Sequence, residues 1–196
     1  FDTEYHDYQV TQQIVDSTKL GINLENYYAS TRAYGIEFEG SYRPGRRFDL
    51  DFAATLQRPV YTSLRYTPLA NEPAVDYNGN QLLRIPRVSV NASPAVQLFD
   101  NRLRLRVSAE YYSNRYADEA NQQKLPHYAV VSADARLRLS PALTLYINGY
   151  NLFNTIGLTE GTPGFSRSST SRTGAQVYLA RPILGRSLKI SLLAAF

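Results

Sequence analysis

The sequence predicts an all-β fold, a segment of an antiparallel transmembrane β-barrel with about eight strands, short periplasmic turns and long extracellular loops. Three observations predict this class. Apolar and polar residues alternate with period 2 in eight separate segments, the pattern of strands with one apolar and one polar face. The connections alternate between tight turns and long polar stretches. Among 196 residues, with 16 Tyr and 8 Phe, no apolar run approaches the ~20 residues that a spanning helix needs.

The predicted strands follow one another along the whole chain. The first, from Phe1 to about Val10, is rich in aromatic residues, and its alternation slips around His6 and Asp7, which indicates a β-bulge. In the other seven, apolar residues occupy every second position. These seven strands are predicted near residues 34–42, 48–57, 88–97, 103–110, 132–139, 143–148 and 187–196.

The two faces of the predicted sheet differ in chemistry. In the segment from Phe48 to Gln57, apolar residues fill one face, while the other face carries Asp49 and Asp51. A face with this many charges needs water or ionic partners, so it cannot pack in a dry core. We therefore expect the polar face to line a lumen and the apolar face to contact lipid. The predicted lumen-facing residues are Glu37, Glu39, Asp49, Asp51, Arg104, Arg106, Glu110, Asp134, Arg136 and Arg138.

The connections predict which end of the sheet faces which side of the membrane. Tight turns with Pro, Gly, Asp and Asn are predicted at residues 43–46, 99–102 and 140–142. The long polar connections cover residues 12–26, 63–84, 114–126 and 154–186. Because neighbouring strands run in opposite directions, all the tight turns fall at one end and all the long loops at the other. Tyrosines near the strand ends, such as Tyr27, Tyr42 and Tyr128, are typical of aromatic girdles at membrane interfaces.

Composition and charge exclude several classes of function. The chain has no Cys and two His, so it contains neither disulfides nor a Cys- or His-rich metal cluster. Its net charge of +4 is spread along the chain without a basic run, which argues against nucleic-acid binding. No Gly-x-Ser-x-Gly motif accompanies His6 or His127. We therefore expect no catalytic residues, no cofactor and no metal site.

The last long connection is basic. It carries Arg167, Arg172, Arg181 and Arg186 against the single acid Glu160, and the first three are the candidates for ligand contact. Such a loop could contact an anionic ligand by charge-assisted hydrogen bonds. Pairing with lipopolysaccharide phosphates is the alternative, and the sequence leaves both open.

The segment from Leu143 to Asn154, LTLYINGYNLFN, resembles the penultimate strand of TonB-dependent outer-membrane receptors. In that family an apolar strand runs into an Asn-Leu-Phe-Asp/Asn signature, here Asn151, Leu152, Phe153 and Asn154. The terminal Phe196 closes an alternating strand and resembles the assembly signal that the bacterial barrel assembly machinery reads. Further similarities lie at residues 32–40, 83–91, 111–121, 127–139 and 185–196.

This resemblance implies a 22-stranded barrel closed by an amino-terminal plug domain. Residues 1–196 would be the carboxyl-terminal barrel portion, with the plug and earlier strands absent from this sequence. The implied function is TonB-coupled uptake, without enzyme activity, of a scarce ligand such as a siderophore, cobalamin or an oligosaccharide across the bacterial outer membrane. The implied partners are outer-membrane lipid, that small-molecule or oligosaccharide ligand, the barrel assembly machinery, and the TonB complex through the absent amino-terminal part.

Two alternatives remain, of which the second is from a different class. The first is a self-contained eight-stranded outer-membrane barrel that acts as an anchor or a small pore. The second is a soluble β-domain that binds a ligand, although soluble sandwiches typically have strands of only about 5–6 residues.

Overall fold

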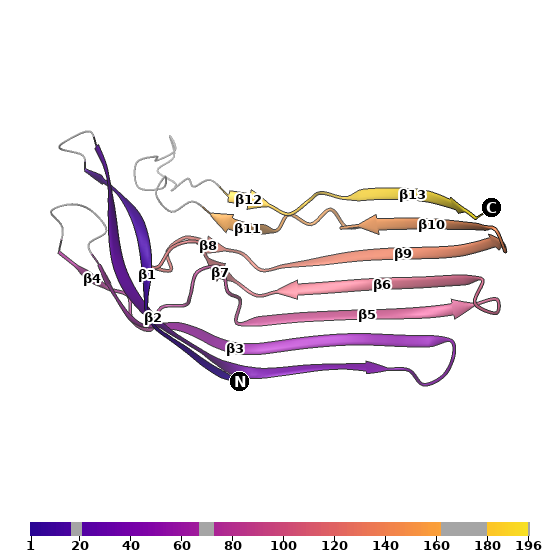
Figure 1. Ribbon diagram of the computed structural model, residues 1–196, viewed down its shortest axis with the longest axis horizontal. Coiled ribbons are helices and arrows are strands. Elements are labelled where there is room, and N and C mark those ends of the chain that lie inside the picture. The colour runs from indigo at the N-terminus through magenta and orange to yellow at the C-terminus, as the bar shows by residue number, and fades with distance from the viewer. Residues whose placement is uncertain (17–20, 67–72, 162–179, 196) are drawn as a thin grey trace.

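A computed structural model describes residues 1–16, 21–66, 73–161 and 180–195, and these residues form a long curved antiparallel sheet (Figure 1). Eight strands follow one another across it in chain order, which confirms the predicted fold class. The eight are β1 (Asp2–Asp16), β2 (Gly21–Tyr42), β3 (Phe48–Tyr66), β5 (Val88–Leu98), β6 (Leu103–Tyr112), β9 (Tyr128–Ser140), β10 (Leu143–Tyr150) and β13 (Ser187–Ala194).

The register of the sheet matches apolar residues with apolar residues from strand to strand. One row across six strands consists of Phe48, Val96, Leu105, Ala135, Ile147 and Ile190. Paired residues share a face, so the apolar positions form one continuous surface. This surface is exposed; 71% of Ile36 and 64% of Ile190 are accessible. In water so large an apolar surface would be unstable or would drive association, whereas lipid covers it without cost.

The tight turns lie together at one end of the sheet, at the right of Figure 1. Between β5 and β6, Phe99, Asp100 and Asn101 all adopt positive φ, and the Arg102 N–H donates to the Phe99 carbonyl at 3.0 Å. Asp and Asn tolerate this left-handed conformation better than most residues. The turns predicted at residues 43–46, 99–102 and 140–142 are confirmed by the strand bounds around them.

The other end of the sheet is more ordered than the sequence predicts. The predicted loop at residues 12–26 is mostly strand, because β1 and β2 stay paired from Val10–Tyr27 to Asp16–Gly21. Residues 12–26 lack the sustained apolar alternation that marks the other strands, so their backbone pairing leaves no pattern in the sequence. The other predicted loops contain short strands: β4 (Val75–Asp76), β7 (Arg115–Tyr116), β8 (Lys124–Leu125), β11 (Leu158–Gly161) and β12 (Ala180–Pro182).

Burial is concentrated at this loop end. A cluster of Ala29, Tyr61, Leu64 and Tyr77 is almost inaccessible, with exposures of 6% or less. It joins β2 and β3 to the connection between β4 and β5. In the described part of the chain, no helix is long and apolar enough to cross a membrane.

Candidate functional site

The polar face of the sheet carries all ten residues that the sequence assigns to it. One row crosses five strands through Asp49, Ala95, Arg106, Asp134 and Asn148. Register and alternation place the others on the same side as this row. Three of the ten, Asp49, Arg106 and Asp134, stand in this row, and the other seven are Glu37, Glu39, Asp51, Arg104, Glu110, Arg136 and Arg138. That this face lines a lumen stays a prediction.

Ion pairs on the polar face converge on Asp49. Arg104 of β6 reaches the Asp49 carboxylate at 3.4 Å across the intervening strand, and Gln97 donates to the same oxygen at 3.4 Å. Arg43, from the turn after β2, lies 3.7 Å from Asp49 and 3.1 Å from Asp51. The carboxylates of Asp49 and Asp51 therefore have a structural role, as ion-pair partners of arginines. Among the described residues, no group of His, Cys, Asp or Glu is arranged to hold a metal ion.

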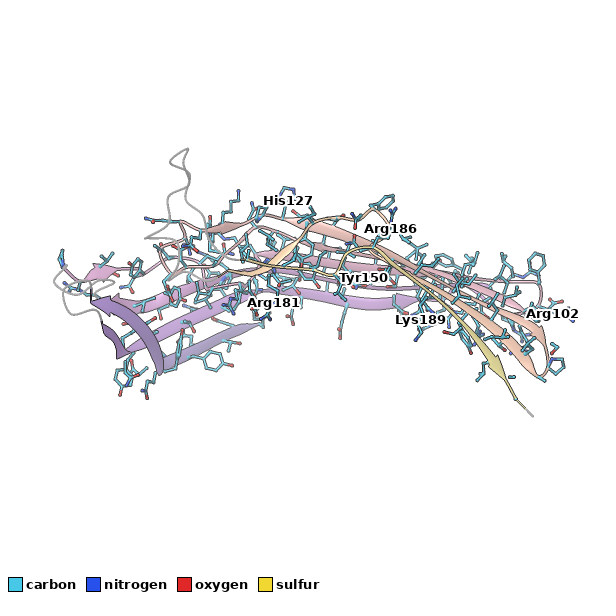
Figure 2. All side chains as sticks on the ribbon, turned by 90° about the horizontal axis from the view of Figure 1, so that it is seen from above. Arg102, His127, Tyr150, Arg181, Arg186 and Lys189 are labelled. Atoms are coloured by element: carbon cyan, nitrogen blue, oxygen red, sulfur yellow. The ribbon has the colours of Figure 1, made fainter. Side chains whose placement is uncertain are left out.

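The basic outer connection is only partly described. Arg167 and Arg172 lie outside the described residues, as does Phe196. Arg181 of β12 is 74% exposed and pairs with Glu160 of β11 at 3.3 Å. Glu160 also lies 3.6 Å from Arg84 of the connection before β5. Figure 2 shows Arg181 far along the sheet from Arg102, which marks the short-turn end.

Arg115 ties the connection between β6 and β9 to the β11–β12 hairpin. Its side chain is buried, and one guanidinium N–H donates to the Leu158 carbonyl at 2.7 Å. The guanidinium also lies over the Tyr128 ring, 5.0 Å from its centroid, and 5.9 Å from that of Tyr112. These cation–π contacts stabilise the arginine in a partly dehydrated site. Tyr128 therefore packs in the interior against Arg115, whereas the sequence suggests a place at the membrane interface.

The Asn-Leu-Phe-Asn signature forms the turn that ends β10. Asn151 is fully buried. Its side-chain NH₂ group donates to the Thr155 carbonyl and, at 3.0 Å, to the Leu184 carbonyl, and its side-chain oxygen accepts from the Thr155 N–H. Leu152 folds back over Gly149, where a Cβ would lie 2.7 Å from the leucine methyl. Asn154 accepts from the Arg186 N–H at 3.0 Å. The signature thus fastens the end of β10 to the segment that enters β13.

An open cavity of about 470 Å³ lies on the polar face at the loop end. Four tyrosines and Thr31 come from the three strands β1, β2 and β3, and the remaining wall comes from two connections. The lining residues are Tyr5, Tyr8, Tyr27, Thr31, Tyr61, Leu82, Leu83, Ile85 and Glu119.

Two β-bulges bring the tyrosines together. The register of β1 shifts between Tyr5 and Tyr8, where Asp7 adopts a φ of +50°, and this confirms the bulge predicted at His6 and Asp7. Tyr5 and Tyr8, three residues apart, would otherwise point to opposite faces. A second shift, beside Thr31, pairs that residue with Tyr61. The bulges therefore aim aromatic rings from both strands into one cavity.

Of the residues that the structure describes, the one charged residue that lines the cavity, Glu119, is an acid. Burial raises the pKa of Tyr27 and Tyr61, and the nearby charge of Glu119 raises both further. The Tyr27 phenol also hydrogen-bonds the Glu119 side chain. Burial and Glu119 likewise raise the pKa of Tyr8. All three phenols are therefore protonated at neutral pH, and they offer the cavity their ring faces and neutral hydroxyl groups.

These shifts predict a pH dependence. Because the folded pKa values of Tyr27 and Tyr61 lie above the ordinary value of 10.0, their contribution to stability is complete below pH 10 and declines as the pH rises above it. In an ultraviolet titration of the full-length protein, the variants Tyr27→Phe and Tyr61→Phe should each remove the absorbance change of one phenol that ionises above pH 10. Loss of an ordinary phenolate signal near pH 10 would contradict the assigned burial.

Sequence reasoning does not identify this cavity. Tyr27 is predicted at an interface, and Glu119 lies in a predicted loop, in the segment 111–121 that was singled out only for its resemblance to the family. The Asn80 side chain donates a hydrogen bond to the Glu119 backbone carbonyl at 2.7 Å, and the Asn121 side chain donates one to the Gln81 backbone carbonyl at 3.0 Å. These contacts join two connections about forty positions apart in the chain. The phase slip at His6 and Asp7 is the one signal in the sequence that pointed to this region.

Comparison with known proteins agrees with the architecture. Residues 1–152 match the family described as "TonB dependent receptor-like, beta-barrel". Comparison with curated protein sequences gave no significant match. Among solved structures, the chain is similar to the siderophore receptor PiuA from Acinetobacter baumannii, with 19% identity and a TM-score of 0.71 over 98% of this chain and 24% of that chain.

Two other solved structures are similar as well. The ferric yersiniabactin uptake receptor FyuA from Yersinia pestis has 19% identity and a TM-score of 0.68, over 86% of this chain and 24% of that chain. The copper transporter OprC has 15% identity and a TM-score of 0.66, over 98% of this chain and 28% of that chain. The chain thus spans about a quarter of the length of each of these proteins. With most of its residues matched by the family, the chain belongs to the TonB-dependent receptor β-barrel family of bacterial outer-membrane transport receptors.

Proposed function

We propose that residues 1–196 form the carboxyl-terminal barrel portion of an outer-membrane receptor that imports a scarce ligand with TonB-coupled energy. The observation that carries this proposal is the sheet itself: one continuous apolar face, one charged face, and short turns at a single end. Such a sheet is stable when lipid covers the apolar face and a wet lumen adjoins the charged face. The role is transport, without a catalytic step.

The ligand class is proposed from the similar proteins. Their names describe a siderophore receptor, a ferric yersiniabactin uptake receptor and a copper transporter. A siderophore or another metal complex is therefore favoured over cobalamin or an oligosaccharide. We propose a plug domain and earlier strands in the same protein, since the chain spans about a quarter of the proteins that it resembles. Contact with the TonB complex would be made through that amino-terminal part.

Two further partners belong to the proposal. Outer-membrane lipid would cover the apolar face, where residues such as Phe38 and Leu192 are more than 60% exposed. The barrel assembly machinery would read the terminal strand that ends at Phe196. Basic residues of the outer connection, Arg167, Arg172 and Arg181, would contact an anionic part of the ligand or the lipopolysaccharide phosphates.

An uptake assay tests the function. The full-length receptor is expressed in a bacterial strain without its own siderophore receptors, and the cells receive radioactive iron bound to catecholate, hydroxamate or carboxylate chelators. We expect uptake from one chelator class to rise at least tenfold over the empty vector. The rise should vanish in a matched strain that lacks TonB, because displacement of a plug requires energy. Equal uptake with and without TonB would contradict the proposal and favour a passive pore.

A further inference from the structure

We propose that the tyrosine-lined cavity binds an aromatic group that carries a positive charge, and that it rejects aromatic anions. The inference rests on the proposed receptor function, since it assigns this cavity to part of the transported ligand. It differs from the expectation that basic loop residues such as Arg181 select an anion.

The size and shape of the cavity suit a flat ring. Its volume of about 470 Å³ lies within the roughly 300–1,000 Å³ of small-molecule sites. Leu82, Leu83 and Ile85, from the connection before β5, give the cavity an apolar lining in addition to the tyrosines of the three strands. Tyr61 is 5% exposed and Thr31 is 6% exposed, so the floor is fixed by packing before a ligand arrives.

The charge of the cavity wall determines which charge on an aromatic ligand is favoured. Glu119 is the one charged residue among the described residues that line the cavity, which include neither Lys, Arg nor His. Its negative charge acts on Tyr8, Tyr27 and Tyr61 alike. A cation would gain from this charge and from the electron-rich faces of the tyrosine rings. An anion would be repelled by Glu119 and would find no cationic partner in the wall.

Four arginines of the neighbouring segments have partners outside the cavity lining. Arg84 and Arg181 face Glu160 of β11, and Arg115 faces the Leu158 carbonyl and two aromatic rings. Arg58 lies on the other face of β3, where its guanidinium contacts the Tyr34 hydroxyl at 3.4 Å. These arginines are absent from the cavity lining.

A binding experiment with three small probes tests the proposal. Benzyltrimethylammonium, benzyl alcohol and benzoate share one ring and differ in charge. Their binding to the purified full-length receptor in detergent is measured by saturation-transfer NMR and equilibrium dialysis. We expect the cation to bind at least tenfold more tightly than benzoate, with the alcohol between them.

Two variants separate charge from shape. Glu119→Gln keeps an oxygen that accepts the Tyr27 hydroxyl, so it should fold, and it should weaken binding of the cation about tenfold while changing that of benzyl alcohol less than twofold. Glu160→Gln is the matched control, since Glu160 is a carboxylate paired outside the cavity, and it should change neither. Tyr61→Leu should weaken the binding of both the cation and benzyl alcohol.

Three results would overturn the inference: benzoate that binds as tightly as the cation, a charge preference that survives Glu119→Gln, or no binding of any probe. The comparison between probes on the unaltered receptor needs no variant, so a misfolded variant leaves the test intact. Failure of the transport proposal is distinguishable, because it would abolish TonB-dependent uptake while probe selectivity remained. Failure of the cavity inference would abolish selectivity while uptake remained.

Discussion

Replacing Asn151 by leucine is expected to lower the free energy of unfolding by about 3–5 kcal/mol. The side chain is 0% exposed and makes three hydrogen bonds, to the Thr155 N–H at 2.8 Å, the Thr155 carbonyl at 2.9 Å and the Leu184 carbonyl at 3.0 Å. Leucine fills the space but leaves these three backbone groups without a partner. Asn151 also has a φ of +48°, a conformation that costs leucine about 1–2 kcal/mol.

The measurement is guanidinium unfolding of the full-length receptor in lipid vesicles, followed by circular dichroism. Asn154→Leu is the matched control, because Asn154 has a similar φ of +52° but is exposed and makes a single side-chain bond, to the Arg186 N–H. It should cost about 1–2 kcal/mol. Asn151→Gly relieves the backbone strain and isolates the lost hydrogen bonds. Equal losses at Asn151 and Asn154 would contradict the assigned role of the buried asparagine.

The strands of the main sheet could be predicted because lipid and water impose opposite demands on their two faces. Every predicted lipid-facing residue of β6 is opposite another apolar residue, as in the pairs Leu105–Ala135 and Val107–Ala133. The bulge at Asp7 was also predictable, because it breaks the period-2 pattern. The same alternation assigns the ten charged residues to one face, and the register of the strands places them together there.

The extensions of β1 and β2 above the apolar band could not be predicted. From Val10 to Asp16 and from Gly21 to Tyr27 the two strands pair continuously, yet neither face of the hairpin there is required to be apolar. The alternation of apolar and polar residues shows which face of a strand is apolar. Pairing of backbones without an apolar face produces no alternation, so it cannot be predicted in this way. The same reason explains why the short strands β7, β8, β11 and β12 were predicted as loops.

The cavity was hidden for a different reason. Its chemistry depends on contacts between distant connections, such as the bond from the Asn80 side chain to the Glu119 carbonyl. Arg43 similarly binds Asp49 and Asp51 from a turn. Polar contacts between loops carry no periodicity, so only the folded chain reveals them.

An arginine at Val107 is expected to cost about 2–4 kcal/mol of unfolding free energy. Val107 is the central one of five apolar positions on β6, from Leu103 to Tyr111, and its side chain is 44% exposed on the apolar face. Eight steps at about 3.4 Å give this series a length of about 27 Å along the strand, which at a tilt of about 40° spans about 21 Å of the ~25 Å apolar band of a membrane barrel. An arginine at its centre would lie near the bilayer midplane, where its charge lacks water.

The cost should depend on depth and on face. Arginine at Leu103 or Tyr111, near the ends of the series, should cost only about 0–1 kcal/mol, because the side chain reaches the interface. Ser108→Arg is the control for face, since Ser108 lies next to Val107 in the chain but accepts a hydrogen bond from Ser93 on the polar side. It should cost less than about 1 kcal/mol, because the charge meets a wet surface. Guanidinium unfolding of the full-length receptor in lipid vesicles measures the series, and equal costs at positions 107 and 108 would mean that lipid does not cover the apolar face.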